Sequence, residues 1–402
     1  MFNLSLFQAS GMLLQLLTIP IIIRNYGLST FGEIALSGSF AILLSNLVNY
    51  GTNQTAVKDV SIHRNDNEKL SYIFSETFLL RLIIFLILIT TTTIVTIVFK
   101  FDYLLLWFSI LPLIASEIFN PLYFLIGIEK IQWISWGNLM ARALSLGFII
   151  FINLHLYIPI FLNLMLFVPL LIYFFIIHFY VIKKFKLSFS VKPLLFLRNK
   201  IKDNFYVTFN GTSVVLQQSI FMFAIAGIAS SQSLGAYGII DKLSGAVRQL
   251  ISAFSSAIYP RAAQLFNDEV DLWIAFKKKI QFGYAIFFLV IAVLIFVLAD
   301  FCSIIFTHKE DPTAILFFKY FSLVPLVIAL NANNVLEMLL RNQYRLMFNI
   351  SLLIVLATSL ISFILTRYFQ ESVIGLYPFI IESICLIIYI YFLRINKKKS
   401  LE

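Results

Sequence analysis

YIPIFLNLMLFVPLLIYFFIIHFYVI, residues 157–182, is a run of 26 residues without a charged side chain. It is longer than the roughly 20 apolar residues that an α-helix needs to cross the hydrocarbon core of a bilayer. Lipid offers no hydrogen-bond partners, so the backbone of such a run must satisfy its own polar groups, as a helix does. This run therefore predicts a membrane-spanning helix.

The same pattern recurs along the whole chain. About twelve segments reach spanning length, and most loops between them are too short to fold alone. The segments cover residues 2–23, 30–51, 73–99, 103–127, 133–152, 157–182, 205–229, 233–259, 280–300, 313–338, 346–366 and 371–393. With 60% hydrophobic and 12% charged residues, the composition excludes a soluble protein with a large core. We predict an all-α polytopic membrane protein of about twelve transmembrane helices.

The distribution of lysine and arginine predicts the orientation of the chain. If the N-terminus is cytoplasmic, the loops and ends on the cytoplasmic side hold 21 of these residues. The opposite side then holds four, namely Arg24, Lys100, Lys309 and Arg367. The positive-inside rule places both termini in the cytoplasm. The net charge of +10 thus reflects topology and the anionic inner leaflet, and we expect no nucleic-acid partner.

A basic stretch at residues 183–204 lies at the middle of the chain and separates six predicted spans from six. An even number of spans per half means that both halves enter the membrane in the same direction. A pseudo-two-fold axis along the membrane normal would then relate them. A short internal echo, residues 28–32 (LSTFG) against 234–238 (LGAYG), supports this relation. The predicted domains are an N-terminal six-helix bundle at 1–182, a cytoplasmic linker at 183–204, a C-terminal six-helix bundle at 205–394 and a basic tail at 395–402.

Charged residues inside the predicted spans are candidate functional groups, because a charge at the bilayer centre is energetically costly. Cations there would form a central cavity that attracts phosphate or carboxylate groups. The candidates are Arg24, Arg142, Lys242, Arg248 and Lys319. Four acids could neutralise these charges or carry a coupling ion: Glu33, Glu117, Asp241 and Glu382. Arg81 and Glu337 are expected to reach the cytoplasmic face and are set aside.

The predicted span 233–259 carries a polar stripe. From Asp241 to Tyr259, polar residues and one glycine follow at spacings of three and four, with Arg248 and Ser252 among them. Such a stripe lines a cavity or faces another polar helix, and pairing of Arg248 with Asp241 is the alternative. The residues expected to line a polar cavity are Gln8, Gln15, Asn210, Gln217 and Ser252. Amides bind sugar hydroxyls, but they also join membrane helices to one another.

Metal and nucleotide chemistry are not indicated. The two cysteines and four histidines are scattered without ligand spacing. No nucleotide-binding P-loop is present, so we expect an ion gradient or the substrate's own gradient to drive any transport. We expect no cofactor and no metal.

Several short motifs resemble a known family. Residues 20–27 (PIIIRNYG), followed by Phe31 and Gly32, and residues 49–51 (NYG) are similar to the first hairpin of polysaccharide transporter flippases. Residues 234–243 (LGAYGIIDKL), in a span expected to end at Pro260, are similar to the eighth span of the same family. The chain thus resembles the O-antigen (Wzx-type) flippases of the multidrug/oligosaccharidyl-lipid/polysaccharide exporter superfamily. The resemblance covers the whole chain in length and span number.

This resemblance implies a function and a location. Members of the family move undecaprenyl-pyrophosphate-linked oligosaccharide repeat units from the cytoplasmic to the periplasmic leaflet of the bacterial inner membrane. They do so by alternating access, coupled to a proton or sodium gradient. Arg24, and Lys242 or Arg248, would then contact the substrate. The modest number of intramembrane cations suggests a neutral or mildly acidic repeat unit. Membrane lipids, a polysaccharide polymerase and a chain-length regulator are the expected partners.

Alternative functions remain at this point. A multidrug or cation antiporter of the same superfamily would favour acidic residues over cations in its binding site. A lipid II flippase usually has two further spans. A membrane polysaccharide polymerase would carry a large periplasmic loop with arginines, whereas the longest outer loop expected here, residues 300–311, has none. We therefore predict a transporter rather than an enzyme.

Overall fold

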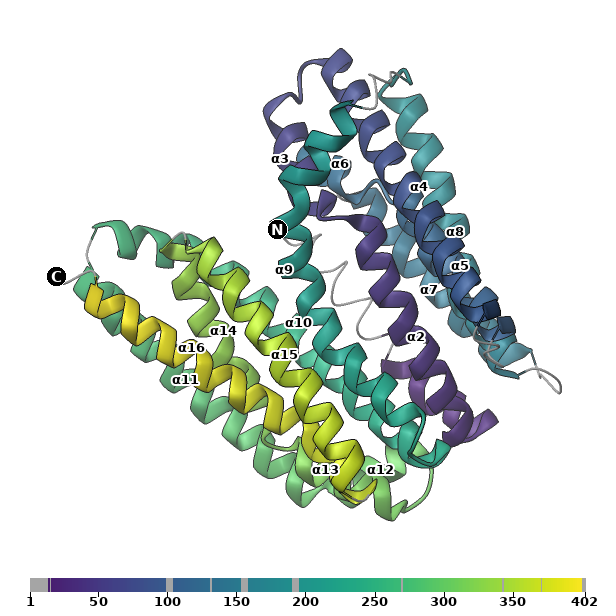
Figure 1. The fold of residues 1–402 in the computed structure, drawn as a ribbon, viewed down its shortest axis with the longest axis vertical. Coiled ribbons are helices and arrows are strands. Elements are labelled where there is room, and N and C mark those ends of the chain that lie inside the picture. The colour runs from purple at the N-terminus through teal and green to yellow at the C-terminus, as the bar shows by residue number, and fades with distance from the viewer. Residues whose placement is uncertain are drawn as a thin grey trace. The chain divides into compact units, whose positions relative to one another are not determined.

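The computed structural model describes residues 14, 16–98, 104–130, 132–152, 158–189, 195–268, 270–341, 343–369 and 371–399. Helices dominate this part of the chain, which contains no strand (Figure 1). The elements are a helix at Leu16–Tyr26, α2 (Leu28–Asn49), α3 (Thr52–Ile62), α4 (Asn67–Val98), α5 (Leu104–Phe119), α6 (Leu122–Gly127), α7 (Gln132–Phe151), α8 (Ile158–Lys184), α9 (Leu195–Ala226), α10 (Ser231–Asp268), α11 (Val270–Val297), α12 (Ala299–Thr307), α13 (Pro312–Phe321), α14 (Val324–Leu340), α15 (Tyr344–Tyr368), the 3₁₀ helix η1 (Glu371–Leu376) and α16 (Tyr377–Lys399).

These helices confirm the predicted polytopic membrane fold. Nine helical segments in the described part of the chain are long and apolar enough to cross a membrane. The short apolar helix Leu16–Tyr26 and the more polar helices α7 and α10 occupy the remaining three positions where the sequence predicts spans. The protein is therefore a multi-pass membrane protein.

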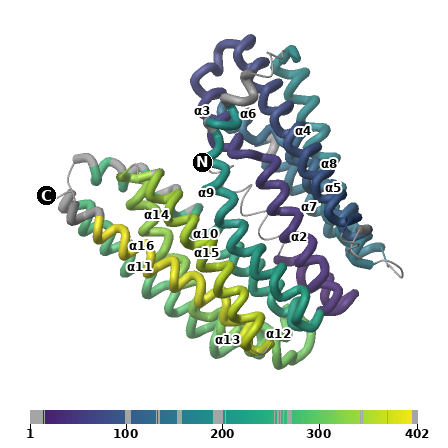
Figure 2. The backbone as a smooth tube through the Cα atoms, viewed as in Figure 1, coloured from purple at the N-terminus to yellow at the C-terminus, as the bar shows by residue number. Residues whose placement is uncertain are grey.

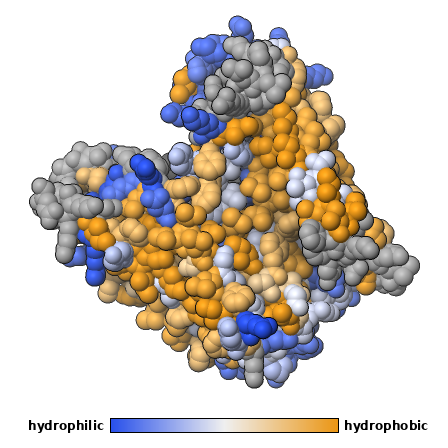
Figure 3. Space-filling view, in the orientation of Figure 1, coloured by the Kyte–Doolittle hydropathy of each residue, from blue (hydrophilic) through white to orange (hydrophobic). Residues whose placement is uncertain are grey.

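The surface supports the same conclusion. Large apolar side chains are exposed along α4 and α11, including Ile94, Phe282 and Val290. Figure 3 shows apolar side chains over much of the visible face of the helices. A soluble monomer rarely exposes such extended apolar patches, whereas a bilayer requires them.

The chain divides into two compact units. The first contains Ile34–Ser219, and the second contains Leu16–Glu33 together with the described residues from Ile220 onward. The chain passes from one unit to the other inside α2 and again inside α9, as the colours of Figure 2 allow the reader to follow. The domain boundaries at 183–204, the pseudo-two-fold relation and the cytoplasmic termini stay predictions.

In the first unit, α5 packs against α4 and α8, and α8 also packs against α7. One core cluster joins Val48 of α2 to Trp107 and Ile114 of α5. The indole N–H of Trp107 donates to Thr93 Oγ1 at 3.2 Å, which satisfies its polar group in an apolar setting. Where the chain leaves the apolar region, between α3 and α4, the backbone N–H of Lys69 donates to the Asp66 carboxylate and lowers the pKa of this residue.

Two breaks in the first unit position polar residues. Between α2 and α3, Tyr50 and Gly51 both have positive φ, of 47° and 69°. Glycine adopts this conformation without steric cost, whereas a tyrosine pays a steric cost for it. The carbonyl oxygen of Tyr50 accepts a hydrogen bond from Asn204 Nδ2 at 3.2 Å. Between α5 and α6, Pro121 interrupts the helix, and Asn120 Oδ1 accepts from the backbone N–H of Leu122 at 3.1 Å. Both breaks turn backbone groups and amides inward.

The second unit is built around α10, a helix of 38 residues, or about 57 Å at 1.5 Å per residue. It packs against α11, α13 and α14, and α14 packs against α16. The helix continues past Pro260, where the predicted span ends, as far as Asp268. Likewise α12 occupies most of the stretch expected to be an outer loop at 300–311.

The two halves of the sequence echo meet in this second unit. A Cβ atom on Gly235 would lie 2.1 Å from the carbonyl oxygen of Leu28. A Cβ on Gly32 would lie 2.8 Å from the backbone N of Gly235. The first turns of α2 and α10 therefore approach so closely that only glycine fits, as in small-residue contacts between membrane helices.

Replacing Gly235 with alanine tests this contact. The added methyl group would meet a backbone atom, so we expect Gly235→Ala to destabilise the protein by about 1–3 kcal/mol. Gly245→Ala, in the same helix but with no atom within 4 Å of the new Cβ, should be neutral or slightly stabilising. Thermal unfolding of both variants in detergent measures the difference. Equal melting temperatures would show that the contact is not tight.

Candidate functional site

A fully buried arginine organises the first unit. Arg81 in α4 has an exposed fraction of 0%. Its Nε and Nη2 atoms both donate to Thr52 Oγ1, at 2.9 and 2.7 Å, and Nη2 also donates to Asn53 Oδ1 at 3.0 Å. The expectation that Arg81 reaches the cytoplasmic face is therefore wrong.

The other side of the same guanidinium binds backbone carbonyls. Arg81 Nη1 donates to the carbonyl oxygens of Glu117 and Asn120, at 2.7 Å each. The guanidinium carbon lies 5.1 Å from the centre of the Tyr123 ring. No carboxylate lies within ion-pair distance of Arg81 in the described residues. Hydrogen bonds and one aromatic face thus stabilise this buried charge, because the breaks at Gly51 and Pro121 free the carbonyls and amides that it needs.

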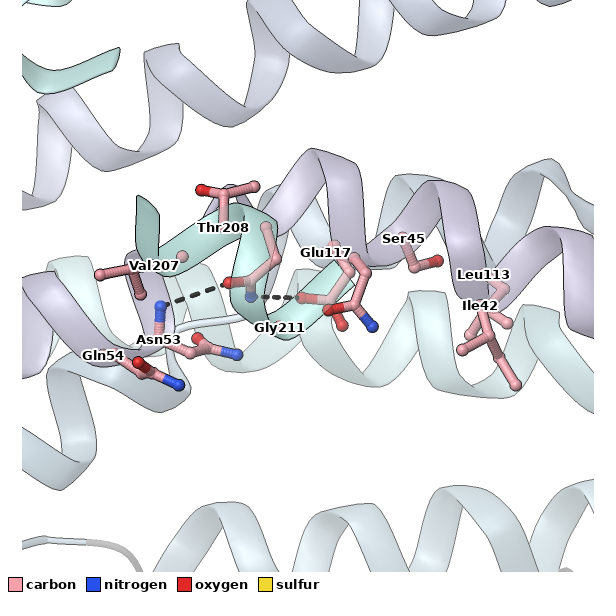
Figure 4. A pocket seen from close by; sticks show the side chains of 12 residues that line it. Ile42, Ser45, Asn53, Gln54, Leu113, Glu117, Val207, Thr208 and Gly211 are labelled. Atoms are coloured by element: carbon pink, nitrogen blue, oxygen red, sulfur yellow. Dashed lines mark hydrogen bonds between the residues drawn. The ribbon is translucent and has the colours of Figure 1, made fainter. Parts of the chain in front are cut away.

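A cavity of about 290 Å³ lies beside this arginine in the first unit (Figure 4). Its walls come from α2 and α3, from α5 and from α9. Most of its polar lining consists of amides and hydroxyls, with one carboxylate, that of Glu117. The polar lining residues are Ser45, Asn46, Asn49, Asn53, Gln54, Glu117 and Thr208.

Hydrogen bonds hold the polar walls of this cavity in place. Asn49 Nδ2 donates to Glu117 Oε2 at 3.3 Å, and Asn49 Oδ1 accepts from the backbone N–H of Asn53 at 3.3 Å, as the dashed lines of Figure 4 show. Asn120 Nδ2 donates to both oxygens of the same carboxylate, at 3.4 and 3.3 Å. The sequence prediction of Glu117 as a functional candidate is not tested by these contacts, but they show how its orientation is maintained.

A second buried cluster lies in the second unit. Arg248 of α10 donates to Glu382 Oε1 of α16 from Nε at 3.2 Å and from Nη2 at 2.6 Å. Asn331 of α14 donates from Nδ2 to the other carboxylate oxygen of Glu382 at 2.7 Å. Three helices thus meet at one carboxylate. The alternative that Arg248 pairs with Asp241 is wrong.

Asp241 has a different partner. Lys242 Nζ lies 3.5 Å from Asp241 Oδ2, and both side chains are largely buried. Neighbouring residues on a helix point in different directions, but the long lysine side chain allows this contact. Two of the five predicted cations, Lys242 and Arg248, are therefore neutralised within the second unit.

The other three predicted cations have no ion pair in the part of the chain that the structure describes. Arg24 and Lys319 are exposed. Arg142, in the middle of α7, is half-buried, and its buried Nε atom has no hydrogen-bond partner among the described residues. Arg142 belongs to the first unit, and Arg24 and Lys319 belong to the second.

The remaining candidates are dispersed. Glu33 is half-buried, and Asn210 has a buried Oδ1 atom without a partner. Gln217 is half-buried and Ser252 is exposed. Gln8 and Gln15 lie outside the described residues. No group of three or more His, Cys, Asp or Glu residues suited to a metal ion gathers within the described ranges.

Sequence reasoning missed several residues of these clusters. Asn49 and Asn53 are spaced four apart, a helical spacing that could have indicated a shared face, but a helix break lies between them. Asn331 begins a cluster with Asn333 and Asn334 in an otherwise apolar span, which is also a visible signal. The partners of Arg81 come from separate breaks in two helices, and no spacing in the sequence indicates them.

Comparison with known proteins identifies relatives over the whole chain. The sequence model of the family described as "Polysaccharide biosynthesis protein" matches residues 1–266. A protein of Escherichia coli (strain K12) named "Putative O-antigen transporter" is 24% identical over 409 aligned positions, which cover 98% of this chain and 96% of the relative.

Solved structures share the fold. An inward-facing multidrug resistance MATE family transporter of the MOP superfamily matches with a TM-score of 0.78 at 11% identity, over 97% of this chain and 96% of that one. A MOP superfamily transporter from Pyrococcus furiosus matches with a TM-score of 0.62 at 12% identity, over 100% and 96% of the two chains. At these identities the likeness concerns the fold.

A double-mutant cycle tests the Arg248–Glu382 pair. Removing either partner leaves a buried charge without a counter-charge, so Arg248→Ala and Glu382→Ala should each destabilise the protein by about 3–5 kcal/mol. The double variant should cost less than the sum of the two. The same cycle on the exposed pair Arg64 and Glu129 should give a coupling below about 1 kcal/mol. Unfolding by SDS in mixed micelles measures the stability of all six variants. Additive effects at Arg248 and Glu382 would show that the two residues are not coupled.

Proposed function

Because the chain belongs to the polysaccharide biosynthesis protein family, we propose that it is a flippase for lipid-linked oligosaccharides. It would move undecaprenyl-pyrophosphate-linked repeat units from the cytoplasmic to the periplasmic leaflet by alternating access. The name of the E. coli relative, which aligns over nearly the whole chain, supports a role in surface polysaccharide export. The transporter fold supports movement of a substrate rather than its chemical conversion.

The observation that carries this proposal is the unpaired cation Arg142. It lies on a membrane helix, is half-buried, and has no ion pair among the described residues. A charge in this position is costly unless a partner neutralises it, and guanidinium groups bind phosphate oxygens through paired hydrogen bonds. A pyrophosphate group of the substrate is the partner that Arg142 lacks.

The other cations divide into two roles. Arg24 and Lys319 are exposed without ion pairs, so they remain candidates for contact with the pyrophosphate. Lys242 and Arg248 are held by Asp241 and Glu382. They would contact an anionic substrate only if it competes with these carboxylates, which could link substrate binding to a rearrangement of the second unit.

Ion coupling needs a group whose charge can change. Glu33 is half-buried and forms no ion pair in the described part of the chain, and Glu117 is held by neutral amides. Asp241 and Glu382 already form ion pairs with Lys242 and Arg248. We therefore favour Glu33 as the carrier of a coupling proton or sodium ion and Glu117 as a carrier of a coupling proton, with Asp241 and Glu382 as the further candidates. Gln8, Gln15, Asn210, Gln217 and Ser252 remain proposed contributors to the polar lining.

The alternatives have less support. The E. coli relative is named a transporter, which argues against a polysaccharide polymerase. A multidrug or cation antiporter would share the fold, but an unpaired arginine on a spanning helix disfavours a cationic ligand. A polymerase and a chain-length regulator would be the partners that receive the flipped unit in the inner membrane.

Deletion of the gene in its native host tests the function. We expect the lipid-linked repeat unit to accumulate on the cytoplasmic side, where an impermeant periodate label on spheroplasts does not reach it, and surface glycan to be lost. Arg142→Ala should restore less than a tenth of the surface glycan, because the pyrophosphate loses its guanidinium partner. Arg142→Lys should restore more, since it keeps the charge but not the paired geometry. Mass spectrometry of extracted lipids and glycan gels measure both.

The control is Arg64→Ala, an exposed arginine outside the clusters, which should restore surface glycan fully at equal membrane levels. Labelling of the repeat unit on spheroplasts of the deletion strain would contradict the flippase proposal. Increased drug susceptibility with intact glycan would favour the antiporter. Full activity of Arg142→Ala would remove this residue from the site while leaving the flippase proposal in place.

A further inference from the structure

We propose that the cavity of the first unit is a binding site for one neutral sugar residue, and that Glu117 excludes acidic sugars from it. Its volume of about 290 Å³ lies at the small end of the range for small-molecule sites. This space suits a single sugar ring rather than an extended glycan. The inference rests on the proposed function only for the source of the sugar. The binding chemistry is argued from the residues that line the cavity.

The cavity contains a buried hydroxyl that lacks a partner. Ser45 lines the cavity, is 8% exposed, and its Oγ atom forms no hydrogen bond with the residues that the structure describes. Figure 4 shows Ser45 of α2 next to Glu117 of α5 among the residues that line the cavity. A buried polar atom without a partner costs about 1–3 kcal/mol, and a hydrogen bond from a ligand to Ser45 Oγ would recover this cost.

Arg81 sets which atoms of Asn53 face the cavity. Because Asn53 Oδ1 accepts from Arg81, the Nδ2 amide group is the one left to donate to a ligand. Glu117 accepts only long hydrogen bonds, of 3.3–3.4 Å, from Asn49 and Asn120, and a carboxylate has about four acceptor positions. The cavity thus presents a fixed donor and a fixed acceptor, with the free hydroxyl of Ser45 beside them. Arg81 acts here as a positioning residue.

This combination favours sugar hydroxyls. Each hydroxyl both donates and accepts, so neighbouring hydroxyls on a ring can bind a carboxylate and an amide N–H together. Ile42, Leu113 and Val207 supply apolar walls for the C–H face of the ring. Such a pairing of apolar walls with a few oriented polar groups is typical of small-molecule sites.

Ions fit the cavity less well. The oxygen of Asn53 accepts from Arg81, and that of Asn49 accepts from the Asn53 N–H, so these two amides present donors rather than acceptors to the cavity. The buried charge of Arg81 also repels a cation. An anionic sugar would meet the carboxylate of Glu117 at short range, where the repulsion is strong in a membrane interior. A neutral hydroxylated ligand avoids both costs.

Gly211 allows the cavity to be filled without disturbing the fold. It lines the cavity from α9, and a Cβ atom built on it meets no atom within 4 Å. Gly211→Leu would therefore place its side chain in the space that the sugar would occupy, and leucine is also a better helix former. Gly147→Leu is the matched control, because Gly147 is a helical glycine of α7 with the same open surroundings outside the cavity.

Binding is measured on the purified full chain in detergent by calorimetry and saturation-transfer NMR. The sugars used are glucose, galactose, N-acetylglucosamine, glucuronate and the oligosaccharide released by mild acid from the host's own lipid-linked unit. We expect the protein to bind the released oligosaccharide or a neutral sugar at least tenfold more tightly than glucuronate. Gly211→Leu should weaken this binding at least tenfold, with an unchanged melting temperature, and Gly147→Leu should not.

Glu117→Gln tests the selectivity. It keeps the shape of the side chain and an acceptor oxygen but removes the charge, so the preference for neutral sugars over glucuronate should fall at least tenfold, with glucuronate binding more tightly than to the parent. A merely structural role of Glu117 would lower the binding of all sugars together. If the parent protein binds none of these sugars, or if the parent and Gly211→Leu bind them equally, the proposal is overturned.

These outcomes separate the sugar site from the flippase function. If the deletion strain blocks glycan movement but Gly211→Leu binds sugar and restores surface glycan normally, the cavity proposal fails and the flippase stands. If the deletion strain moves its glycan normally while sugar binding depends on Gly211, the sugar site stands and the flippase proposal fails.

Discussion

The hydrocarbon core of the bilayer cannot satisfy a polar group, and this constraint governs the whole structure. Backbone groups obey it by forming helices, and apolar side chains obey it by facing outward along helices such as α4 and α11. Polar side chains either form hydrogen bonds or ion pairs inside the protein, or they destabilise it. The positions where a partner is missing, such as Arg142 Nε and Ser45 Oγ, are therefore the informative ones.

The two units meet this constraint in different ways. In the first unit, Arg81 has no counter-charge within ion-pair distance among the described residues, and carbonyls and hydroxyls from helix breaks stabilise it. In the second unit, Arg248 is stabilised by the carboxylate of Glu382, which Asn331 supports from a third helix. A network of neutral acceptors keeps its geometry when a nearby proton moves. An ion pair depends on the charges of both partners, so the two units stabilise their buried arginines in different ways.

Much of the architecture could be predicted from hydrophobic runs. Every described span falls where the sequence indicates one, because spanning length and charge depletion are local properties. The differences between the predictions and the structure have other physical causes. Pro260 does not end α10, since a proline removes one hydrogen bond, and the long helix tolerates this loss. The sequence places Arg81 near the cytoplasmic end of a predicted span, but its burial depends on Thr52, Asn53 and Asn120, which are 28 to 39 residues away in sequence.

The sequence by itself determined that this protein is a helical membrane protein and where its apolar helices lie along the chain. Those features depend on composition over stretches of about 20 residues, which a single chain displays directly. Only the tertiary structure decided which of the charges are neutralised. Lys242 and Arg248 have carboxylate partners, whereas Arg142 does not. The physical reason is that a buried charge is stabilised by groups within a few ångströms in space, and helix breaks and packing bring these together from distant parts of the chain.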